Sequence, residues 1–288
     1  MSSNDTAPEG SGSPFRTERT ARDEAPQYVL PLVVRIEKAE PPARTDALRT
    51  AARAVLVMLS DDRALGEGEW AEAVRDWQDA RIRKVVRRAR GGEWRRAAEL
   101  PGITVTGDTA QVRVFPPVPL DGWPKELAKL QVSGTELTDP EEPEESERPE
   151  DSAGPADQAR ETGPAEAREA GLAEAQAPGP AEETGPAEAP VPAQAVLWLN
   201  PDLRMSTGKE MAQVGHGAQL LWWELPDDAR KAWREAGFPL EVRTAARDQW
   251  SSLTTSGLPV VRDAGFTEIA PGSCTVVSQY VGGEGPSA

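Results

Sequence analysis

The sequence predicts an α/β protein with a small mixed four-stranded sheet and flanking helices, preceded by a second, degenerate copy of the same fold. Three observations support this class. Short runs rich in β-branched residues alternate with segments of helical periodicity. A stretch of Pro, Glu, Ala and Gly divides the chain into two ordered parts. The segments on either side of that stretch follow one another in a similar order.

Composition divides the chain into five regions. Residues 1–26 are expected to be disordered, 27–138 to form an N-terminal domain, 139–193 a linker, 194–283 a second domain and 284–288 a tail. The linker holds 16 acidic and 3 basic side chains, whereas residues 27–138 hold 16 acidic and 18 basic ones. The linker lacks the apolar surface needed to offset chain entropy. It is either a self-repelling spacer or an acidic mimic of nucleic acid that competes for a basic groove.

In the N-terminal part, residues 28–36 predict a strand, which Pro31 places at an edge or a bulge. Helices are predicted at 45–59, 68–80 and 93–99. Residues 82–90 fit either a strand or a helix. Strands at 102–106 and 111–115 flank a Gly107–Asp108 turn.

In the C-terminal part, strands are predicted at 195–199, 239–243, 258–262 and 273–281, and helices at 207–223, 226–236 and 246–254. The resulting order is β-α-α-β-α-β-β. The two parts can be laid over each other as a weak internal duplication. In that register Lys209 lies opposite Thr45, Gln213 opposite Arg49 and His216 opposite Ala52. The first part would then have kept the fold and lost the polar face; chance similarity of two small α/β domains is the alternative.

The composition excludes several classes of protein. A single cysteine, Cys274, rules out an internal disulfide framework, and with one histidine, His216, no His/Cys zinc site can form. No cofactor is expected. The first 26 residues carry no secretory signal, and no apolar run is long enough to span a bilayer. We therefore expect a cytoplasmic protein that does not contact membranes.

The helix predicted at 207–223 carries the first candidate site. Thr207 and Glu210 have the spacing of a capping box. Lys209, Gln213 and His216 are spaced at i, i+4 and i+7 and project from one face. A lysine in the first turn opposes the helix dipole, so this placement indicates function. A lone histidine on a helix is often structural, and both interpretations of His216 stay open.

The second candidate site is the loop that follows the strand at 258–262. Asp263 comes where that strand ends, and Thr267 lies four residues further on. Strand ends beside a helix N-terminus are common places for sites in α/β domains. An ordinary polar loop is the alternative.

Together these two stretches resemble a known family. Residues 203–218 are similar to the signature helix of the archaeal/eukaryotic-type peptidyl-tRNA hydrolases, and residues 261–272 to that family's second signature. The resemblance covers about residues 195–282. It implies a mixed four-stranded α/β domain that hydrolyses the ester between a peptide and the 3′ end of tRNA, recycling tRNA in translation. The residues that it implies for catalysis are Lys209, Gln213, His216, Asp263 and Thr267.

The chain departs from the family at two positions of the signature helix. Thr207 stands where a second basic residue is usual, and Glu210 replaces a usually apolar residue. A weaker grip on tRNA, or help from elsewhere in the chain, is one consequence. The alternative function is a non-catalytic RNA- or protein-binding relative.

For the hydrolase we expect Asp263 to orient or activate water, while Lys209 and the helix N–H groups stabilise the developing negative charge. Gln213 and Thr267 would position water or the carbonyl, and His216 would make a further polar or RNA contact. In the N-terminal part, eight basic residues fall within positions 81–96. They form a solvated basic face or contact phosphates along tRNA; the candidate RNA contacts are Arg81, Lys84, Arg87, Arg88 and Arg95. The two parts could also pack as an intramolecular pseudo-dimer with one live site.

Overall fold

The computed structural model describes residues 26–140, 194–264 and 268–281. The predicted disordered N-terminus, nearly all of the linker, the tail and Thr267 lie outside the described residues. The N-terminal half has the elements β1 (Tyr28–Arg35), α2 (Arg44–Ser60), a 3-10 turn (Asp62–Ala64), α3 (Ala71–Asp79), β2 (Arg83–Ala89), α4 (Gly91–Glu99), β3 (Ile103–Thr106), β4 (Gln111–Val114), β5 (Val118–Pro119) and α5 (Lys125–Ala128). The C-terminal half has β6 (Ala195–Leu199), α6 (Thr207–Glu224), α7 (Asp227–Glu235), β7 (Leu240–Thr244), α8 (Arg247–Thr255), β8 (Val260–Arg262) and β9 (Cys274–Tyr280).

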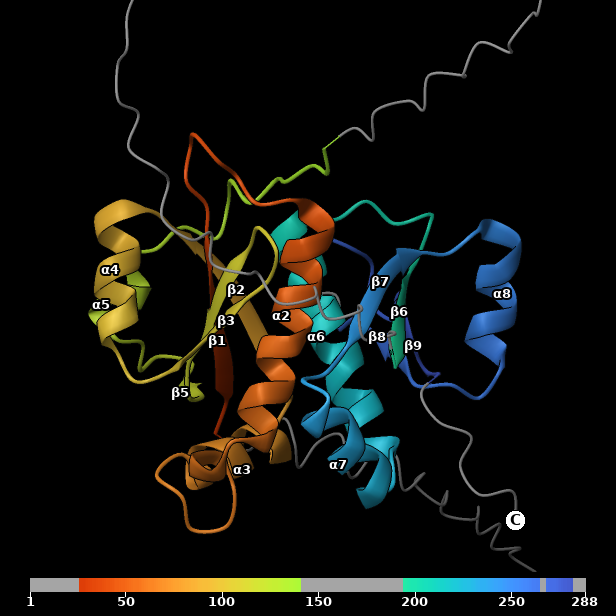
Figure 1. The fold of residues 1–288 in the computed structure, drawn as a ribbon, viewed down its shortest axis with the longest axis horizontal. Helices are drawn as coiled ribbons and strands as arrows, with labels where there is room; N and C mark the ends of the chain where they lie inside the picture. The colour runs from red at the N-terminus through yellow and green to blue at the C-terminus, as the bar shows by residue number, and fades with distance from the viewer. Residues whose placement is uncertain (1–25, 141–193, 265–267, 282–288) are drawn as a thin grey trace, which may run out of the picture. The chain divides into compact units, whose positions relative to one another are not determined.

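The two halves share one topology. The strand order is β2-β1-β4-β3 in the first sheet and β7-β6-β9-β8 in the second, and β5 pairs with one end of β1. In each sheet the first strand runs parallel to one neighbour and antiparallel to the other. Both halves are therefore mixed α/β sheets with flanking helices, as the sequence predicted (Figure 1).

Two local details identify positions of the first half that are equivalent to positions of the second. The indole nitrogens of Trp77 and Trp233 each donate to the carbonyl six residues further along the chain. Ile82 and Phe238, five residues after these tryptophans, have φ values of 44° and 58°, a left-handed conformation that is uncommon for such side chains. A shared turn geometry at matched positions is what a second copy of the fold requires.

The helix caps set a different register from the one expected. Ala43 and Ser206 are the N-cap residues of α2 and α6. Lys209, Gln213 and His216 are thus equivalent to Asp46, Thr50 and Arg53, one residue beyond the predicted Thr45, Arg49 and Ala52. A shift of one residue along a helix rotates the side chain by about 100° around the helix axis. The corrected register therefore changes which side chains of α2 and α6 are equivalent.

Two expectations about strands also change. Residues 82–90 left strand and helix open, and the structure gives a strand, β2, parallel to β1. Pro31 was expected at an edge or bulge, but β1 lies inside the sheet between β2 and β4. Pro31 is tolerated because it falls where β1 changes partner, from β5 at Tyr28–Val29 to β4 at Leu32–Val34, so its missing N–H breaks no ladder bond.

Helices α2 and α6 pack against each other between the two sheets (Figure 1). Each also contacts a strand of the other half: α2 contacts β7 and α6 contacts β2. One hydrophobic cluster contains residues of both halves, among them Leu48, Leu56, Leu197 and Met211. Smaller clusters lie under α4 and α5 on one outer face and under α8 on the other. Among the helices of the described residues, none is both long and apolar enough to cross a membrane.

Candidate active site

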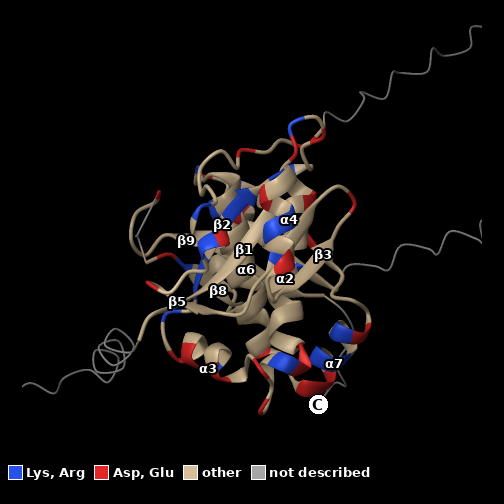
Figure 2. Cartoon of the chain, turned by 90° about the vertical axis from the view of Figure 1, so that its left-hand side faces the viewer, with Lys and Arg blue, Asp and Glu red and all other residues tan. Residues whose placement is uncertain are grey.

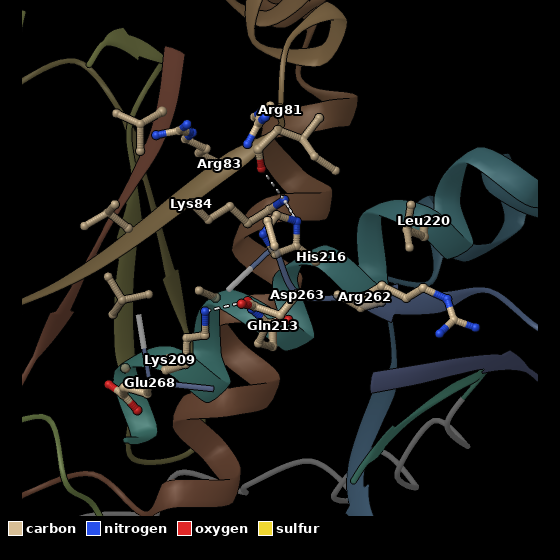
Figure 3. A pocket seen from close by; sticks show the side chains of 18 of the residues that line it. Arg81, Arg83, Lys84, Lys209, Gln213, His216, Leu220, Arg262, Asp263 and Glu268 are labelled. Atoms are coloured by element: carbon tan, nitrogen blue, oxygen red, sulfur yellow. Dashed lines mark hydrogen bonds and ion pairs between the residues drawn. The ribbon is translucent and has the colours of Figure 1, made fainter. Parts of the chain in front are cut away.

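A cavity of about 1080 Å³ opens between the two halves. The C-terminal half contributes α6 and the loop after β8, including Lys209, Gln213, His216 and Asp263. The N-terminal half contributes residues 80–86, which lead into and form the start of β2. Figure 3 shows these side chains converging from both halves. The candidate site is thus shared, although its sequence signatures all lie in one half.

The first turn of α6 is held differently from the predicted capping box. Ser206 is the cap, and its Oγ accepts from the Lys209 N–H at 3.3 Å. Thr207 instead accepts from the Leu137 N–H at 3.1 Å, and Glu210 faces α2. The capping-box prediction was therefore wrong by one residue, because the tertiary contacts engage Thr207 and Glu210 elsewhere.

The N–H groups at the start of α6 already have partners. Gly208 N donates to Oγ1 of the fully buried Thr135 at 3.1 Å, and Lys209 N donates to Ser206. Ser206 in turn is held by Glu268, which accepts from its N–H and its hydroxyl, both at 2.7 Å. The expectation that these helix N–H groups stabilise an oxyanion is thus corrected, since Thr135 and Ser206 take that place.

Asp263 is the centre of the polar cluster. Its Oδ2 accepts from Lys209 Nζ at 2.5 Å and from Gln213 Nε2 at 2.8 Å. The carboxylate is 8% exposed and the lysine side chain 14%. The i, i+4 spacing on α6 therefore does what the sequence predicted, because it brings both side chains to the end of β8.

Thr275 is a site residue that the sequence did not indicate. This fully buried side chain on β9 donates to Gln213 Oε1 at 2.6 Å, which fixes the amide with its NH₂ group toward Asp263. Thr275 lies beside α6 because β9 packs against that helix, so no local pattern could have revealed it.

His216 lies one turn further along α6, where Lys84 of the other half contacts it. Lys84 Nζ is 3.1 Å from His216 Nδ1 (Figure 3). Burial and the nearby charges of Lys84 and Lys209 lower the pKa of His216 well below its usual value. Burial also lowers the pKa of Lys84 well below its usual value. The imidazole is therefore neutral at pH 7.

The basic residues of the N-terminal half lie in different surroundings. Figure 2 shows Lys and Arg around β2 and α4. Lys84 is 8% exposed and belongs to the cavity, which Arg81 also lines. Arg87 donates to the Leu130 carbonyl at 2.5 Å and Arg88 to the Ser133 carbonyl at 2.8 Å, so both hold the segment after α5. Arg95 is exposed on α4.

The corresponding place in the N-terminal half has a different chemistry. The β3–β4 pairing puts Gly107 where β8 and β9 put Asp263. A Cβ at Gly107 would collide with Asp46 and Thr50, the residues that replace Lys209 and Gln213. Asp46 accepts from the N–H groups of Thr109 and Ala110 at 2.6 and 2.7 Å. In this half, Asp46 therefore holds the loop between β3 and β4, and no lysine–carboxylate pair forms there.

A comparison with known families finds a match in the C-terminal half. Residues 193–280 match the model of peptidyl-tRNA hydrolase PTH2. This match confirms the resemblance that the sequence of the C-terminal part predicted. The match begins at β6 and ends at β9, so it contains Lys209, Gln213, His216 and Asp263. The PTH2 domain thus supplies the cluster of Lys209, Gln213 and Asp263, whereas Lys84 lies outside the matched residues.

Proposed function

We propose that this chain hydrolyses the ester of peptidyl-tRNA in the cytoplasm, releasing free tRNA and peptide. The observation that carries this proposal is the Lys209–Asp263–Gln213 cluster, which belongs to the PTH2 domain and faces the cavity between the two halves. A domain that only bound RNA would not need a buried carboxylate paired with a lysine. Retention of this set therefore favours hydrolysis over a non-catalytic binding relative.

In the proposed reaction, Asp263 orients a water molecule for attack on the ester carbonyl carbon. The carbonyl oxygen becomes an oxyanion, which the Lys209 ammonium stabilises. The bond to the 3′ oxygen of tRNA then breaks, that oxygen takes a proton, and the peptide leaves with a carboxyl group. Because the cluster is largely shielded from solvent, its charge interactions are stronger than they would be in water.

Two further residues complete this proposal. Gln213 is held by Thr275 and positions the Asp263 carboxylate. Thr267 keeps the role that the family resemblance implies, as a residue that positions water or the substrate carbonyl.

For the tRNA itself we propose contacts along the N-terminal half. Arg81 at the cavity and exposed Arg95 on α4 keep the role of phosphate contacts, and the carbonyl-bound Arg87 and Arg88 would contribute through their charge. Lys84 is proposed for a different role below. Binding of deacylated tRNA should weaken as the salt concentration rises. Arg95→Gln should reduce the slope of the logarithm of the association constant against the logarithm of the salt concentration by about one. A slope unchanged from wild type would remove Arg95 from the contact.

We also propose that residues 27–138 and 194–283 act as the two domains of a pseudo-dimer with one live site. The shared topology, the packing of α2 on α6 and the reciprocal contacts of each helix with the other sheet support this arrangement. The N-terminal domain would then take the place that a second copy of the PTH2 domain could occupy.

Release of an N-acetylated amino acid from charged tRNA tests the function. Lys209→Met and Asp263→Asn should each lower kcat/KM by roughly 10²- to 10³-fold. Matched surface changes, Lys231→Met on α7 and Asp248→Asn on α8, should leave it unchanged. Wild-type rates in both site variants, or no release by the wild-type protein, would refute the proposal.

A further inference from the structure

Lys84 is a buried lysine that the PTH2 domain does not contain. It projects from β2 across the boundary between the halves, and its stem passes α6 at Gly215. A Cβ added at Gly215 would lie 3.3 Å from Lys84 Cδ and 3.0 Å from Val55 Cγ2. This glycine therefore leaves the space through which the lysine reaches the cavity.

Three acceptors surround the Lys84 amino group. They are His216 Nδ1 at 3.1 Å, Gln219 Oε1 at 2.5 Å and the Ile82 carbonyl at 3.4 Å. The ring of Trp77 lies 4.9 Å from Nζ. An ammonium has three hydrogens to donate and is attracted by an aromatic face, so these groups favour the charged form and oppose the effect of burial.

The fold itself does not require this lysine. The matched tryptophans and left-handed turn residues make Lys84 equivalent to Leu240, and the matched helix caps make Gln219 equivalent to Leu56. Both leucines are buried in the hydrophobic core. The contact of α2 with β7 is thus apolar at this position, whereas the equivalent contact of α6 with β2, beside the cavity, is polar. Since burying a lysine costs stability, the exchange calls for a functional account.

The contact also fixes the hydrogen on His216. An ammonium can only donate, so Nδ1 must accept, and in a neutral imidazole Nε2 then carries the hydrogen. His216 is half-buried and lines the cavity. The charged groups that share this cavity are Lys84, Arg81, Arg83, Lys209, Asp263, Arg262 and Glu268.

We propose that Lys84 is a positioning residue, supplied by the N-terminal half, that holds His216 as its Nε2–H tautomer. His216 is then an uncharged hydrogen-bond donor to an oxygen of the substrate. The identity of that substrate rests on the proposed function, whereas the tautomer does not. On this account the PTH2 domain is incomplete without the N-terminal half.

Nitrogen NMR of the full chain, labelled with ¹⁵N-histidine and carrying no histidine tag, tests the tautomer directly. His216 is the only histidine, so a single imidazole is observed. We expect protonated Nε2 and unprotonated Nδ1 from pH 6 to pH 8. An Nδ1–H tautomer or an imidazolium in the wild-type protein would overturn the proposal. This measurement stands even if the protein releases no peptide, so its failure and that of the proposed function are separable.

The double variant Lys84→Leu/Gln219→Leu removes the contact and copies the apolar pair of the other half, so it should fold. We expect a mixture of tautomers, a His216 pKa closer to 6.5, and kcat lower by roughly 10- to 100-fold with little change in KM. The acid limb of the pH–rate profile should move to higher pH. A folded double variant with the wild-type tautomer and pH profile would overturn the proposal.

A last experiment identifies the substrate oxygen that accepts a hydrogen bond from His216 Nε2–H. The probes are the trinucleotide CCA, and 3′-amino-CCA acylated with N-acetylphenylalanine, in which an amide replaces the ester. A change in the Nε2–H signal with both probes points to a phosphate oxygen, and a change with the acylated probe alone points to the carbonyl. No change with either would refute the donor role.

Discussion

Arg44→Met removes the guanidinium that pairs with Glu210 across α2 and α6, and we expect it to lower the free energy of unfolding by about 2 kcal/mol. The pair is bidentate, with Nε–Oε2 at 2.9 Å and the second nitrogen at 2.6 Å from Oε1. The Arg44 side chain is 27% exposed and that of Glu210 10%. Loss of a partner from a fully buried pair costs about 3–5 kcal/mol and from an exposed pair below about 1, so an intermediate value follows.

Glu210 stands where the family resemblance leads us to expect an apolar residue, and α2 supplies Arg44 beside it. The double variant Arg44→Met/Glu210→Leu should therefore recover most of the loss, since no unpaired buried charge remains. Urea unfolding followed by tryptophan fluorescence measures all three variants. The nine tryptophans are spread over both halves, so the signal reports on each.

An exposed ion pair provides the control. Arg247 and Asp202 are 80% and 57% exposed, and Arg247→Met should change the free energy of unfolding by less than about 0.5 kcal/mol. A loss below about 0.5 kcal/mol in Arg44→Met would refute the reasoning. So would a double variant whose loss equals the sum of those of the two single variants.

Three other predictions concern the site. Gly215→Val should cost about 2–3 kcal/mol in urea unfolding and lower kcat by roughly 10- to 100-fold, because the added carbons meet the Lys84 stem; full stability would contradict the close approach. Below about pH 6.5 the unfolded chain protonates His216 whereas the folded chain does not, because its folded pKa is lowered. Stability should thus fall more between pH 7 and 5.5 in the wild type than in His216→Asn, and equal losses would contradict this. Gln213→Glu places a second carboxylate beside Asp263 and should lower kcat by about tenfold or more at pH 7; an unchanged rate would exclude that repulsion.

Most of the elements could be predicted from the sequence because their signals are local. The helical spacing around Lys209 and the strand that ends at Asp263 required only neighbouring residues. The errors arose where a distant segment changed a local preference. Thr207 did not cap α6 because Leu137 donates to its hydroxyl, and Pro31 was accommodated inside a sheet because β1 changes partner beside it.

The sequence by itself determined the class of fold and indicated Lys209, Gln213 and Asp263 as candidates, since periodicity and signature spacing are properties of short segments. Only the tertiary structure decided what completes the cavity. In the sequence, Lys84 is one basic residue among several. Only the pairing of β2 with β1 brings the Lys84 side chain into contact with α6. Burial and contact over more than a hundred residues depend on how α2 and α6 pack, and no local pattern carries that information.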